Sequence, residues 1–424
     1  MIDIKRIRTE PERFIQAAKA KRLKVDVNAL LEIDGRLADA RRELQDIRTE
    51  QNKAGKEIAR LAGDARQAVI ARMSELKSRA KELNDLIADL EPKCDELMLL
   101  VPEPPDPDVP FGDDETANVE VRRVGDVPKF DFTPKDHVQL GELLGIIDVP
   151  RGVKLAGSRN FVLKGAGAML HHAVLRLAMD MMLAKGYQPL TVPVLVNDSV
   201  MYGTGYFPIG RDEAYLCERD GMSLVGTAEV PVTGLHADEI LEEAELPKKY
   251  VAMSTCFRRE AGAAGKDTYG LYRIHYFDKV EQVIIAPNDE GRSKKFHQEI
   301  LANAEGVVKA LNLPYRVVNC CTGDLGIGNV QRFDIEIWMP SRNGYGETHS
   351  ASRYYEFQAR RLNIRYRDSD GKVRFCHTLN NTVIASPRIL IPILELCQNA
   401  DGSVTVPEAL RPYVGGMEKI EVPR

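Results

Sequence analysis

Several features that mark particular classes of protein are missing from this sequence of 424 residues. Its seven cysteines include no C-x-x-C pair and no cysteine–histidine cluster at zinc spacing, which argues against a structural zinc site. No apolar run reaches the length of about 18 residues that a membrane span needs, and the N-terminus lacks the apolar core of a signal peptide. We therefore expect reduced thiols, no membrane contact and a cytoplasmic location.

A strong charge of either sign is also absent. The formal net charge is −5, so contact with nucleic acid would need a local basic surface. Hydrophobic residues make up 44% and charged residues 29% of the chain, as in ordinary globular proteins. The length allows two or three domains, each with its own core.

The N-terminal quarter contains a heptad pattern. Over residues 30–61 and again over residues 69–101, apolar side chains recur with a 3-4-3-4 spacing. Gly63 and Asp64 interrupt the pattern. We expect two helices, each about 50 Å long at 1.5 Å per residue, that form an antiparallel coiled coil over about residues 27–98.

Charge along this hairpin is uneven. Between residues 41 and 81, eleven Lys and Arg residues face six Asp and Glu residues, whereas both flanks are acidic. A solvated coiled-coil surface and a lever whose basic tip binds a phosphate backbone both fit this pattern. The candidate phosphate contacts are Arg41, Arg42, Arg48, Lys53, Lys56, Arg60, Arg72, Lys77 and Arg79.

Five prolines between residues 101 and 110 predict a stiff linker. We place the domain boundary there, with one domain over residues 1–103 and another over residues 104–424. In the second domain, β-type runs alternate with helical ones. The β-type runs are residues 161–164, 250–257, 272–285, 315–319 and 333–339, and the helical runs include 169–185 and 293–311. The pattern predicts an α+β fold around a largely antiparallel sheet.

The most informative segment lies between residues 256 and 281, where two strands joined by a loop rich in glycine, alanine and lysine are the simplest structure. Alternate side chains of a strand share a face, so five residues of the second strand should point one way. They are Arg273, His275, Phe277, Lys279 and Glu281. At 3.3 Å per residue, Phe277 and Glu281 would stand about 13 Å apart. The Phe277 ring could stack on a purine, and the Glu281 carboxylate could bind an ammonium group. An exposed strand with alternating charges is the alternative.

This segment resembles motif 2 of the class II aminoacyl-tRNA synthetases, and it is most similar to bacterial-type seryl-tRNA synthetase. The shared pattern is Phe-Arg-x-Glu, a loop, and then Arg-x-His-x-Phe-x-Lys-Val-Glu. Other segments resemble the same family in its order along the chain. They are Thr227-Ala-Glu-Val-Pro231, Glu347-Thr-His-Ser350, Thr378-Leu-Asn-Asn-Thr382 and Ala385-Ser-Pro-Arg388. Together with the hairpin they cover nearly the whole chain.

The resemblance implies a class II catalytic domain behind a tRNA-binding hairpin. It implies a serine–tRNA ligase that uses ATP and Mg²⁺ to form seryl-adenylate and passes serine to the 3′ end of tRNA(Ser), with tRNA(Sec) left open as a second acceptor. Gly186-Tyr-Gln-Pro-Leu-Thr-Val-Pro193 resembles motif 1, which implies a homodimer. The nine basic hairpin residues become candidate tRNA contacts, and neither DNA nor a membrane is an implied partner.

The resemblance also assigns residues to each ligand. For serine they are Thr227, Ala228, Glu229, Arg258, Glu281, Asn380 and Thr382. For ATP they are Arg258, Arg259, Glu260, Ile274, Phe277, Glu347, Thr348, His349, Ser350 and Arg388. Glu347 and Ser350 would hold Mg²⁺ through hard oxygen ligands. His171 and His172, in an apolar helical run, are interpreted as packing residues.

A phosphate-binding role for Arg388 is also indicated by the residues around it. Ser386-Pro387 is typical of an N-cap followed by proline at the first helical position. An arginine next to it opposes the helix dipole, and a bound phosphate would resolve that conflict. A surface ion pair is the alternative.

Two other functions fit parts of the sequence. One is a synthetase-like paralogue that activates serine or another small amino acid for a non-tRNA acceptor or for antibiotic self-resistance. The other is an inactive nucleic-acid-binding scaffold. The basic hairpin favours tRNA over the first, and the intact set of charged motif residues disfavours the second. Tyr269, Tyr276 and Ala351 stand where the family often has arginine, glutamine and cysteine, and Tyr276 is expected to point away from the Phe277 face.

Overall fold

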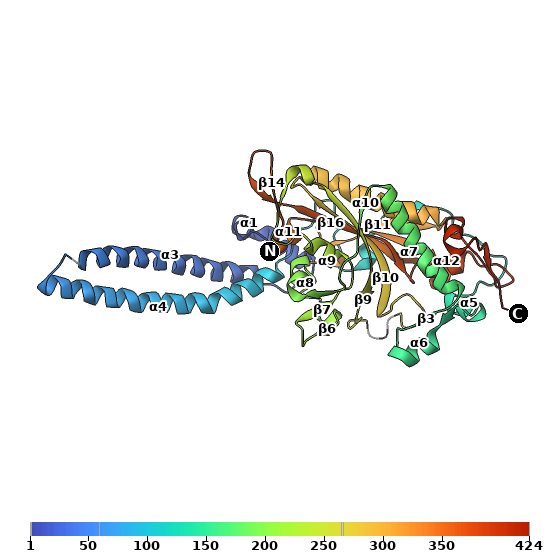
Figure 1. Cartoon of the computed structure of the whole chain (residues 1–424), viewed down its shortest axis with the longest axis horizontal. Helices are drawn as coiled ribbons and strands as arrows, with labels where there is room; N and C mark the ends of the chain where they lie inside the picture. The colour runs from blue at the N-terminus through green and yellow to red at the C-terminus, as the bar shows by residue number, and fades with distance from the viewer. Residues whose placement is uncertain (1, 59, 264, 266, 424) are drawn as a thin grey trace. The chain divides into compact units, whose positions relative to one another are not determined.

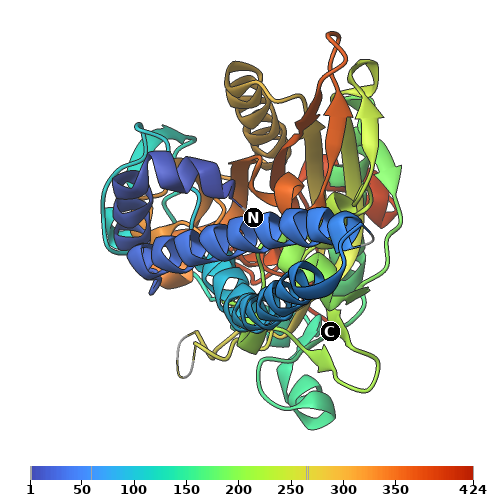
Figure 2. The same cartoon turned by 90° about the vertical axis from the view of Figure 1, so that its left-hand side faces the viewer.

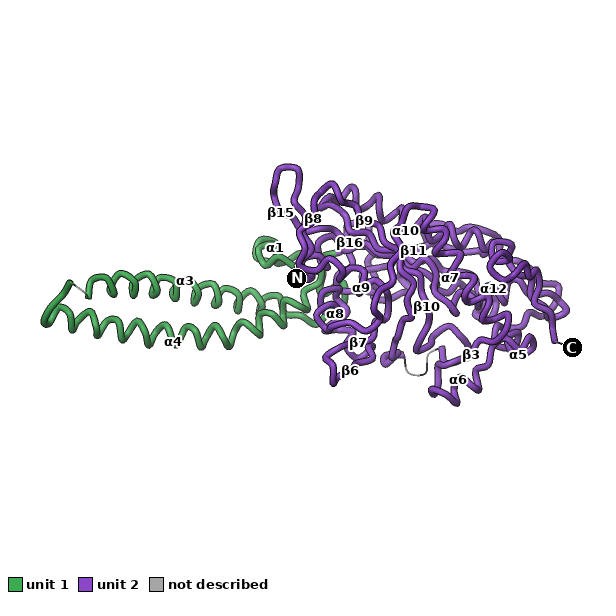
Figure 3. Tube along the Cα trace, viewed as in Figure 1, with its two compact units in different colours: residues 1–104 green, residues 105–424 purple. Residues whose placement is uncertain are grey.

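The computed structural model describes residues 2–58, 60–263, 265 and 267–423. The chain divides into two compact units, Met1–Pro104 and Pro105–Arg424 (Figure 3). Ala264 and Lys266, in the loop predicted to join the two motif 2 strands, lie outside the described residues. None of the described helices is long and apolar enough to cross a bilayer.

The first unit contains the helical hairpin. Its helices are α1 (Ile4–Thr9), α2 (Pro11–Ala20), α3 (Val27–Ile58) and α4 (Gly63–Leu100). α3 and α4 lie side by side in both views (Figures 1 and 2), and Leu44 and Ile47 of α3 pack with Leu83 of α4. The predicted coiled coil is confirmed, although Gly63, expected in the turn, already begins α4.

An eight-stranded sheet organises the second unit. In spatial order its strands are β1 (Val119–Val124), β11 (Tyr315–Asn319), β12 (Gln331–Met339), β13 (Gly344–Tyr355), β16 (His377–Ser386), β10 (Tyr276–Ala286), β9 (Lys248–Phe257) and β4 (Gln188–Leu190). Neighbours are antiparallel except β4 and β9, which are parallel. The predicted α+β fold with a largely antiparallel sheet is confirmed.

Two long helices, α7 (Ala166–Ala184) and α10 (Glu290–Ala310), pack on one face of this sheet (Figure 1). Leu170 of α7 and Leu301 of α10 share a core with Val280 of β10. Because successive side chains of a strand face opposite ways, the neighbours of Val280 in β10 face away from these helices.

The opposite face carries two short helices. α9 (Glu229–Gly234) and α11 (Phe357–Leu362) pack over the C-terminal half of β10, called its far end, where Val283 and Ile285 are buried. The N-terminal half of β10, called its near end, borders a cleft. The β10 side chains that face away from α7 and α10 are therefore covered near residues 283–285 and line the cleft near residues 277–281.

Shorter elements surround the sheet. They are α5 (His137–Leu143), α6 (Val149–Ala156), α8 (Asp198–Thr204), α12 (Leu390–Leu396), β2 (Ile147–Asp148), β3 (Val162–Leu163), β5 (Leu195–Asn197), β6 (Leu216–Cys217), β7 (Met222–Leu224), β8 (Ile240–Glu242), β14 (Arg365–Arg367), β15 (Val373–Phe375), β17 (Val404–Thr405) and β18 (Lys419–Ile420).

The predicted start of the second motif 2 strand is wrong. β10 begins only at Tyr276, so Arg273 and His275 precede it. Arg273 turns to Glu260, with Nη1 2.7 Å from Oε2, and the ring of His275 lies 3.0 Å from the carbonyl oxygen of Arg258. These side-chain contacts hold the segment in an irregular turn, which strand alternation does not foresee.

The predicted helix cap at Ser386 is also wrong. Ser386 is the last residue of β16 and is fully buried, and α12 begins only at Leu390 with Ile389 as its N-cap. Arg388 therefore stands in the turn between β16 and α12. Ser386 belongs to the strand because it pairs with Asp278 of β10.

Candidate active site

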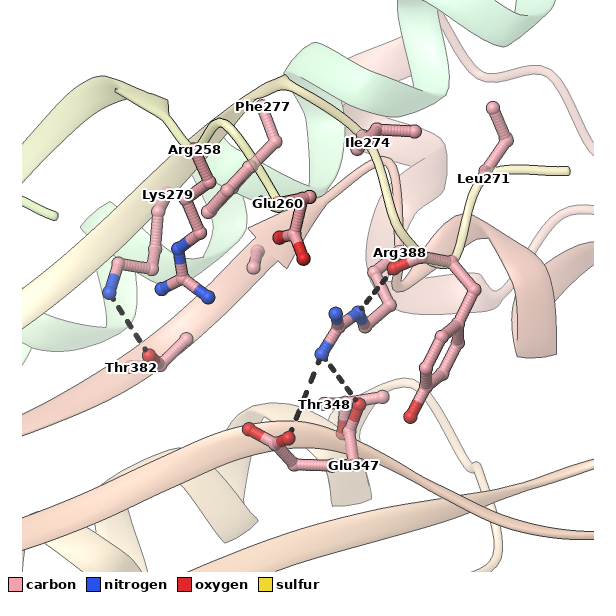
Figure 4. Close-up of a pocket in the computed structure, with 12 residues that line it drawn as sticks. Arg258, Glu260, Leu271, Ile274, Phe277, Lys279, Glu347, Thr348, Thr382 and Arg388 are labelled. Carbon is pink, nitrogen blue, oxygen red and sulfur yellow. Dashed lines mark hydrogen bonds and ion pairs between the residues drawn. The ribbon is translucent and has the colours of Figure 1, made fainter. Parts of the chain in front are cut away.

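The cleft at the near end of β10 has two adjoining parts. The first part is lined by Arg258, Glu260, Leu271, Tyr272, Ile274, Phe277, Lys279, Glu347, Thr348, Thr382, Ala385 and Arg388 (Figure 4). The second part is lined by Thr204, Gly205, Tyr206, Glu229, Arg258, Lys279, Glu281, Gly326, Ile327, Gly328, Asn329, Arg332, Glu347, Ser350, Ser352, Tyr354, Asn380 and Thr382. Four of these residues border both parts, so the cleft is continuous.

β10 supplies three cleft side chains at alternate positions. Phe277 borders the first part, Glu281 borders the second, and Lys279 between them borders both. The guanidinium of Arg258 lies over the Phe277 ring, 5.1 Å from its centroid. The prediction that Phe277 and Glu281 share one strand face is confirmed.

Two β-bulges direct side chains into the cleft that a regular strand would direct to the other face of the sheet. In β13, Thr348 is an extra residue relative to β12, so Glu347 and Ser350 both reach the cleft although they are three positions apart. In β16, an extra residue after Thr382 allows Thr382 and Ala385 to line the first part together. Both bulges therefore gather polar groups around the same space.

Charged groups in the first part are held by their neighbours. The Arg388 guanidinium stacks on Tyr272, 4.4 Å from the ring centroid, and its Nε donates to the Tyr272 carbonyl at 3.0 Å. Its Nη1 donates to the Glu347 carbonyl at 3.1 Å (Figure 4). With Arg258 and the Phe277 ring on the opposite side, this part offers two guanidinium groups for phosphate and an aromatic surface for a base.

The second part is polar. Its volume is about 290 Å³, close to the lower limit of the roughly 300–1,000 Å³ of small-molecule sites. Glu281 is only 2% exposed; its Oε2 lies 2.6 Å from Lys279 Nζ and accepts a hydrogen bond from Thr382 Oγ1 at 3.3 Å. The buried amide nitrogen of Asn380 makes no hydrogen bond of normal geometry within the described residues. A ligand oxygen there would satisfy that donor.

A second carboxylate, Glu229, lies at this end of the cleft. It is buried and accepts hydrogen bonds from Gln358 Nε2 at 2.7 Å and from the Tyr206 hydroxyl at 3.1 Å. Burial, reinforced by the negative charge of Glu281, raises the pKa of Glu229 to about 7. Glu229 therefore changes its charge near neutral pH.

The pKa of Glu229 predicts a pH dependence for any ligand with an ammonium group. Only the carboxylate attracts that group, and protonation below about pH 7 removes the charge. The KM for serine, the amino acid that the motifs imply, should rise up to about tenfold between pH 8 and pH 6 in ATP–pyrophosphate exchange. Glu229→Gln cannot ionise and should flatten this profile. An unchanged profile in the variant would contradict the role of Glu229.

Four residues that the motifs assigned to ligands do not line the cleft. Arg259 is exposed and donates to a neighbouring backbone carbonyl at 3.1 Å. His349 is buried on the other side of its strand, where burial lowers its pKa to about 3. Thr227 and Ala228 are buried beside Glu229, and the Thr227 hydroxyl accepts from the Glu229 N–H at 3.2 Å. Thr227 thus supports the backbone that carries Glu229.

Sequence reasoning missed several residues of the lining. They are Leu271, Tyr272 and Ala385 in the first part, and Tyr206, the segment 326–329, Arg332, Ser352 and Tyr354 in the second. Most come from turns or from strands whose exposed side is set by long-range pairing. Only Gly326-Ile-Gly328, where two glycines flank an apolar residue, carries a local signal for a close backbone approach.

Metal-ligand side chains occur in two places. Within the described chain, one cluster contains Cys320 and Asp334, which are buried, and Asp324, which is partly buried. The Arg332 guanidinium lies among them, with Nη2 2.7 Å from Asp324 and 3.1 Å from Asp334, so an ion-pair network accounts for this cluster. In the cleft, by contrast, the Glu347 carboxylate is half exposed and the Ser350 hydroxyl lies on the same wall. These oxygen ligands fit a Mg²⁺ ion bound to phosphate.

The nine basic hairpin residues fall into two groups. Four make ion pairs with hairpin carboxylates: Arg41 with Glu91, Arg42 with Asp39, Arg72 with Glu50, and Arg79 with Glu43 and Glu82. The other five are exposed and have no ion pair within the described residues: Arg48, Lys53, Lys56, Arg60 and Lys77. The second group leaves its charge available to a polyanion.

The three departures from the family pattern lie outside the cleft lining. The ring of Tyr276 points away from Phe277 and stacks on Phe161 at 5.1 Å, as strand alternation predicted. Tyr269 is exposed, and its hydroxyl lies 3.3 Å from Asp136. Ala351 is fully buried. None of the three side chains lines either part of the cleft.

Known proteins resemble this chain along its full length. Residues 1–105 match the family described as seryl-tRNA synthetase N-terminal domain, and residues 215–396 match the tRNA synthetase class II core domain (G, H, P, S and T). The chain is 44% identical to the serine–tRNA ligase of Deinococcus radiodurans over 100% of both proteins. It is 43% identical to that of Symbiobacterium thermophilum over 99% of this chain and 100% of the relative.

Two solved structures are similar in fold as well as in sequence. The seryl-tRNA synthetase from Pyrococcus horikoshii complexed with ATP superposes with a TM-score of 0.94 at 37% identity, covering 100% of both chains. The cytoplasmic serine–tRNA ligase from Naegleria fowleri in complex with AMP gives a TM-score of 0.86 at 30% identity, covering 98% of this chain and 96% of the other. The likeness extends over the hairpin and the cleft alike.

Proposed function

Because this chain belongs to the seryl-tRNA synthetases, a family of class II aminoacyl-tRNA synthetases, we propose that its cleft holds ATP in the first part and serine in the second. The activity of the chain is ATP-dependent ligation of serine to tRNA. One observation carries the placement of the ligands: a single face of β10 presents Phe277, Lys279 and Glu281 along a continuous cleft.

In the first part, Phe277 stacks on the adenine, with Glu260 and Ile274 at its edge. Arg258 binds the α-phosphate and Arg388 the terminal phosphates, because a guanidinium matches phosphate oxygens in charge and geometry. Glu347 and Ser350 would hold Mg²⁺, which neutralises phosphate charge when bound.

In the second part, Glu281 pairs with the ammonium group of serine, and Glu229 adds a second negative charge. Thr382 and Asn380 meet the serine hydroxyl, which gives the buried Asn380 amide a hydrogen bond of normal geometry. Lys279 lies at the junction of the two parts, where the serine carboxylate meets the α-phosphate.

The reaction proceeds in two steps. A carboxylate oxygen of serine attacks the α-phosphorus in line, and pyrophosphate leaves. A terminal ribose hydroxyl of tRNA then attacks the carbonyl carbon of seryl-adenylate, and AMP leaves. The cleft residues act by alignment and by charge stabilisation, for which Arg258 and Lys279 are placed between the two ligands.

The proposal extends to the N-terminal unit and to the assembly. Arg48, Lys53, Lys56, Arg60 and Lys77, which have no ion pair within the described residues, contact the tRNA backbone. A homodimer forms through α7 and the edge strand β4. The exposed apolar side chains Met169 and Leu183 of α7 support this assembly. The seven free thiols support a reducing, cytoplasmic setting.

Substrate selectivity tests this placement of serine. ATP–pyrophosphate exchange should occur with serine and fall by a factor of about 10⁴ with alanine, because Thr382 and Asn380 would lose the partner that the hydroxyl supplies. Glycine should fail for the same reason, and the extra methyl group of threonine should reduce exchange by steric overlap. Comparable exchange with any of these three amino acids would refute the assignment of the second part.

A further inference from the structure

His171 connects the two strands that lead to the proposed ATP contacts. It projects from α7, and its side chain is 12% exposed. Nδ1 lies 2.9 Å from Ser386 Oγ and Nε2 lies 2.9 Å from Asp278 Oδ2. Because a carboxylate only accepts, the Nε2–H donates to Asp278, and Nδ1 shares the second hydrogen bond with the Ser386 hydroxyl. A residue that the sequence interpretation treated as packing therefore uses both ring nitrogens.

The two partners of His171 stand directly opposite each other on neighbouring strands. Asp278 pairs with Ser386 in the register of β10 and β16, and with Thr255 in the register of β10 and β9. Thr255 donates to Asp278 Oδ1 at 2.6 Å. The hydrogen bond from His171, followed by that from Thr255, holds the pKa of Asp278 below its usual range although burial opposes it. Three strands are thus joined on the face that α7 covers.

These contacts lie behind the nucleotide part of the cleft. Asp278 directly follows Phe277, and Ser386 stands two residues before Arg388. Phe277 and Arg388 both line the first part of the cleft, one from β10 and one from the turn after β16. The spacing between them therefore depends on how β10 and the end of β16 are held together.

We propose that His171 is a positioning residue for ATP, which sets the spacing of Phe277 and Arg388 by bridging Asp278 and Ser386 from the rear of the sheet. This inference rests on the proposed function, because Phe277 and Arg388 are assigned to ATP there. His171 itself does not line the cleft, so its effect reaches ATP only through the two strands.

Steady-state ATP–pyrophosphate exchange tests the role through two separate KM values. His171→Ala should raise the KM for ATP about fivefold to tenfold, since it removes two hydrogen bonds, one of them to a charged group. The KM for serine should stay within about twofold, because Glu281 and Thr382 make no contact with His171 and lie three and four residues from Asp278 and Ser386 along their strands. His171→Gln keeps one donor and one acceptor and should return the ATP KM to within about twofold of the unaltered protein.

The neighbouring His172 provides a matched control. It is exposed on the face of α7 that carries Met169 and touches the His171 ring edge-on; His172→Ala can weaken the proposed dimer but should leave both KM values of the dimeric enzyme unchanged. If His171→Ala does not fold, Ser386→Ala removes one of the two bonds from the other side and should raise the ATP KM about threefold. A merely structural role would lower kcat with the fraction of active enzyme and leave the ATP KM unmoved, and that result would overturn the inference.

Phe277→Ala distinguishes a failure of the positioning role of His171 from a failure of the proposed ATP placement. If Phe277→Ala raises the KM for ATP while His171→Ala and Ser386→Ala do not, the positioning role fails and the placement of ATP stands. If Phe277→Ala leaves the ATP KM unchanged, the placement of ATP itself fails.

Discussion

Glu281→Gln should lower kcat/KM for serine in ATP–pyrophosphate exchange by a factor of about 10² to 4 × 10³. Glu281 is 2% exposed, and its carboxylate lies 2.6 Å from the ammonium group of Lys279. Glutamine keeps the shape but removes the charge that the serine ammonium group needs. Losing one partner of a buried ion pair costs roughly 3–5 kcal/mol, and each 1.4 kcal/mol is a factor of ten.

The binding of ATP distinguishes a specific loss of serine binding from a general loss of folded protein. ATP should still raise the melting temperature of Glu281→Gln, because the first part of the cleft does not include this residue. Glu305 offers a matched control, since its buried carboxylate pairs with Arg122 at 2.6 Å and lies outside the cleft. Glu305→Gln should cost stability but leave the serine KM unchanged. Normal serine activation by Glu281→Gln would contradict the assignment of Glu281 to the ammonium group of serine.

Removal of the hairpin should abolish tRNA charging while serine activation persists. Deleting residues 36–90 removes all nine candidate tRNA contacts and leaves the catalytic unit Pro105–Arg424 untouched. We expect kcat/KM for tRNA to fall at least about 10²-fold, because several phosphate contacts are lost together. Exchange without tRNA should stay within about twofold. Unchanged charging would refute the role of the hairpin.

A charge variant tests the same idea with the coiled coil intact. Arg48, Lys53, Lys56, Arg60 and Lys77 are exposed and lie outside the apolar seam, so replacing all five with glutamine should preserve the helices. Charging should weaken and should depend less steeply on salt concentration, because fewer counterions are released on binding. Lys93→Gln, on the acidic flank and paired with Asp89 at 2.8 Å, is the control and should behave normally.

Features with a local period could be predicted from the sequence. The heptads gave the coiled coil, and the alternation of Phe277, Lys279 and Glu281 gave the shared face that organises the cleft. Both depend on side-chain spacing along one element, which the order of residues states directly. The antiparallel sheet followed from the same kind of reasoning combined with the family resemblance.

Features that depend on long-range pairing could not be predicted. The bulge at Thr348 decides that Glu347 and Ser350 meet in the cleft while His349 is buried, and no local motif marks a bulge. Ser386 continues a strand because Asp278 lies opposite it, although Ser-Pro is typical of a helix start. The ion pairs of Arg41 and Arg79 likewise need the partner helix in place.

The most direct test of the ligand placement is a crystal structure of this protein with a non-hydrolysable seryl-adenylate mimic. We expect the adenine ring to stack on Phe277, the ammonium group to lie within hydrogen-bonding distance of Glu281, and the linkage between them to lie beside Arg258 and Lys279. A mimic bound elsewhere, or bound with its two ends reversed along β10, would contradict it.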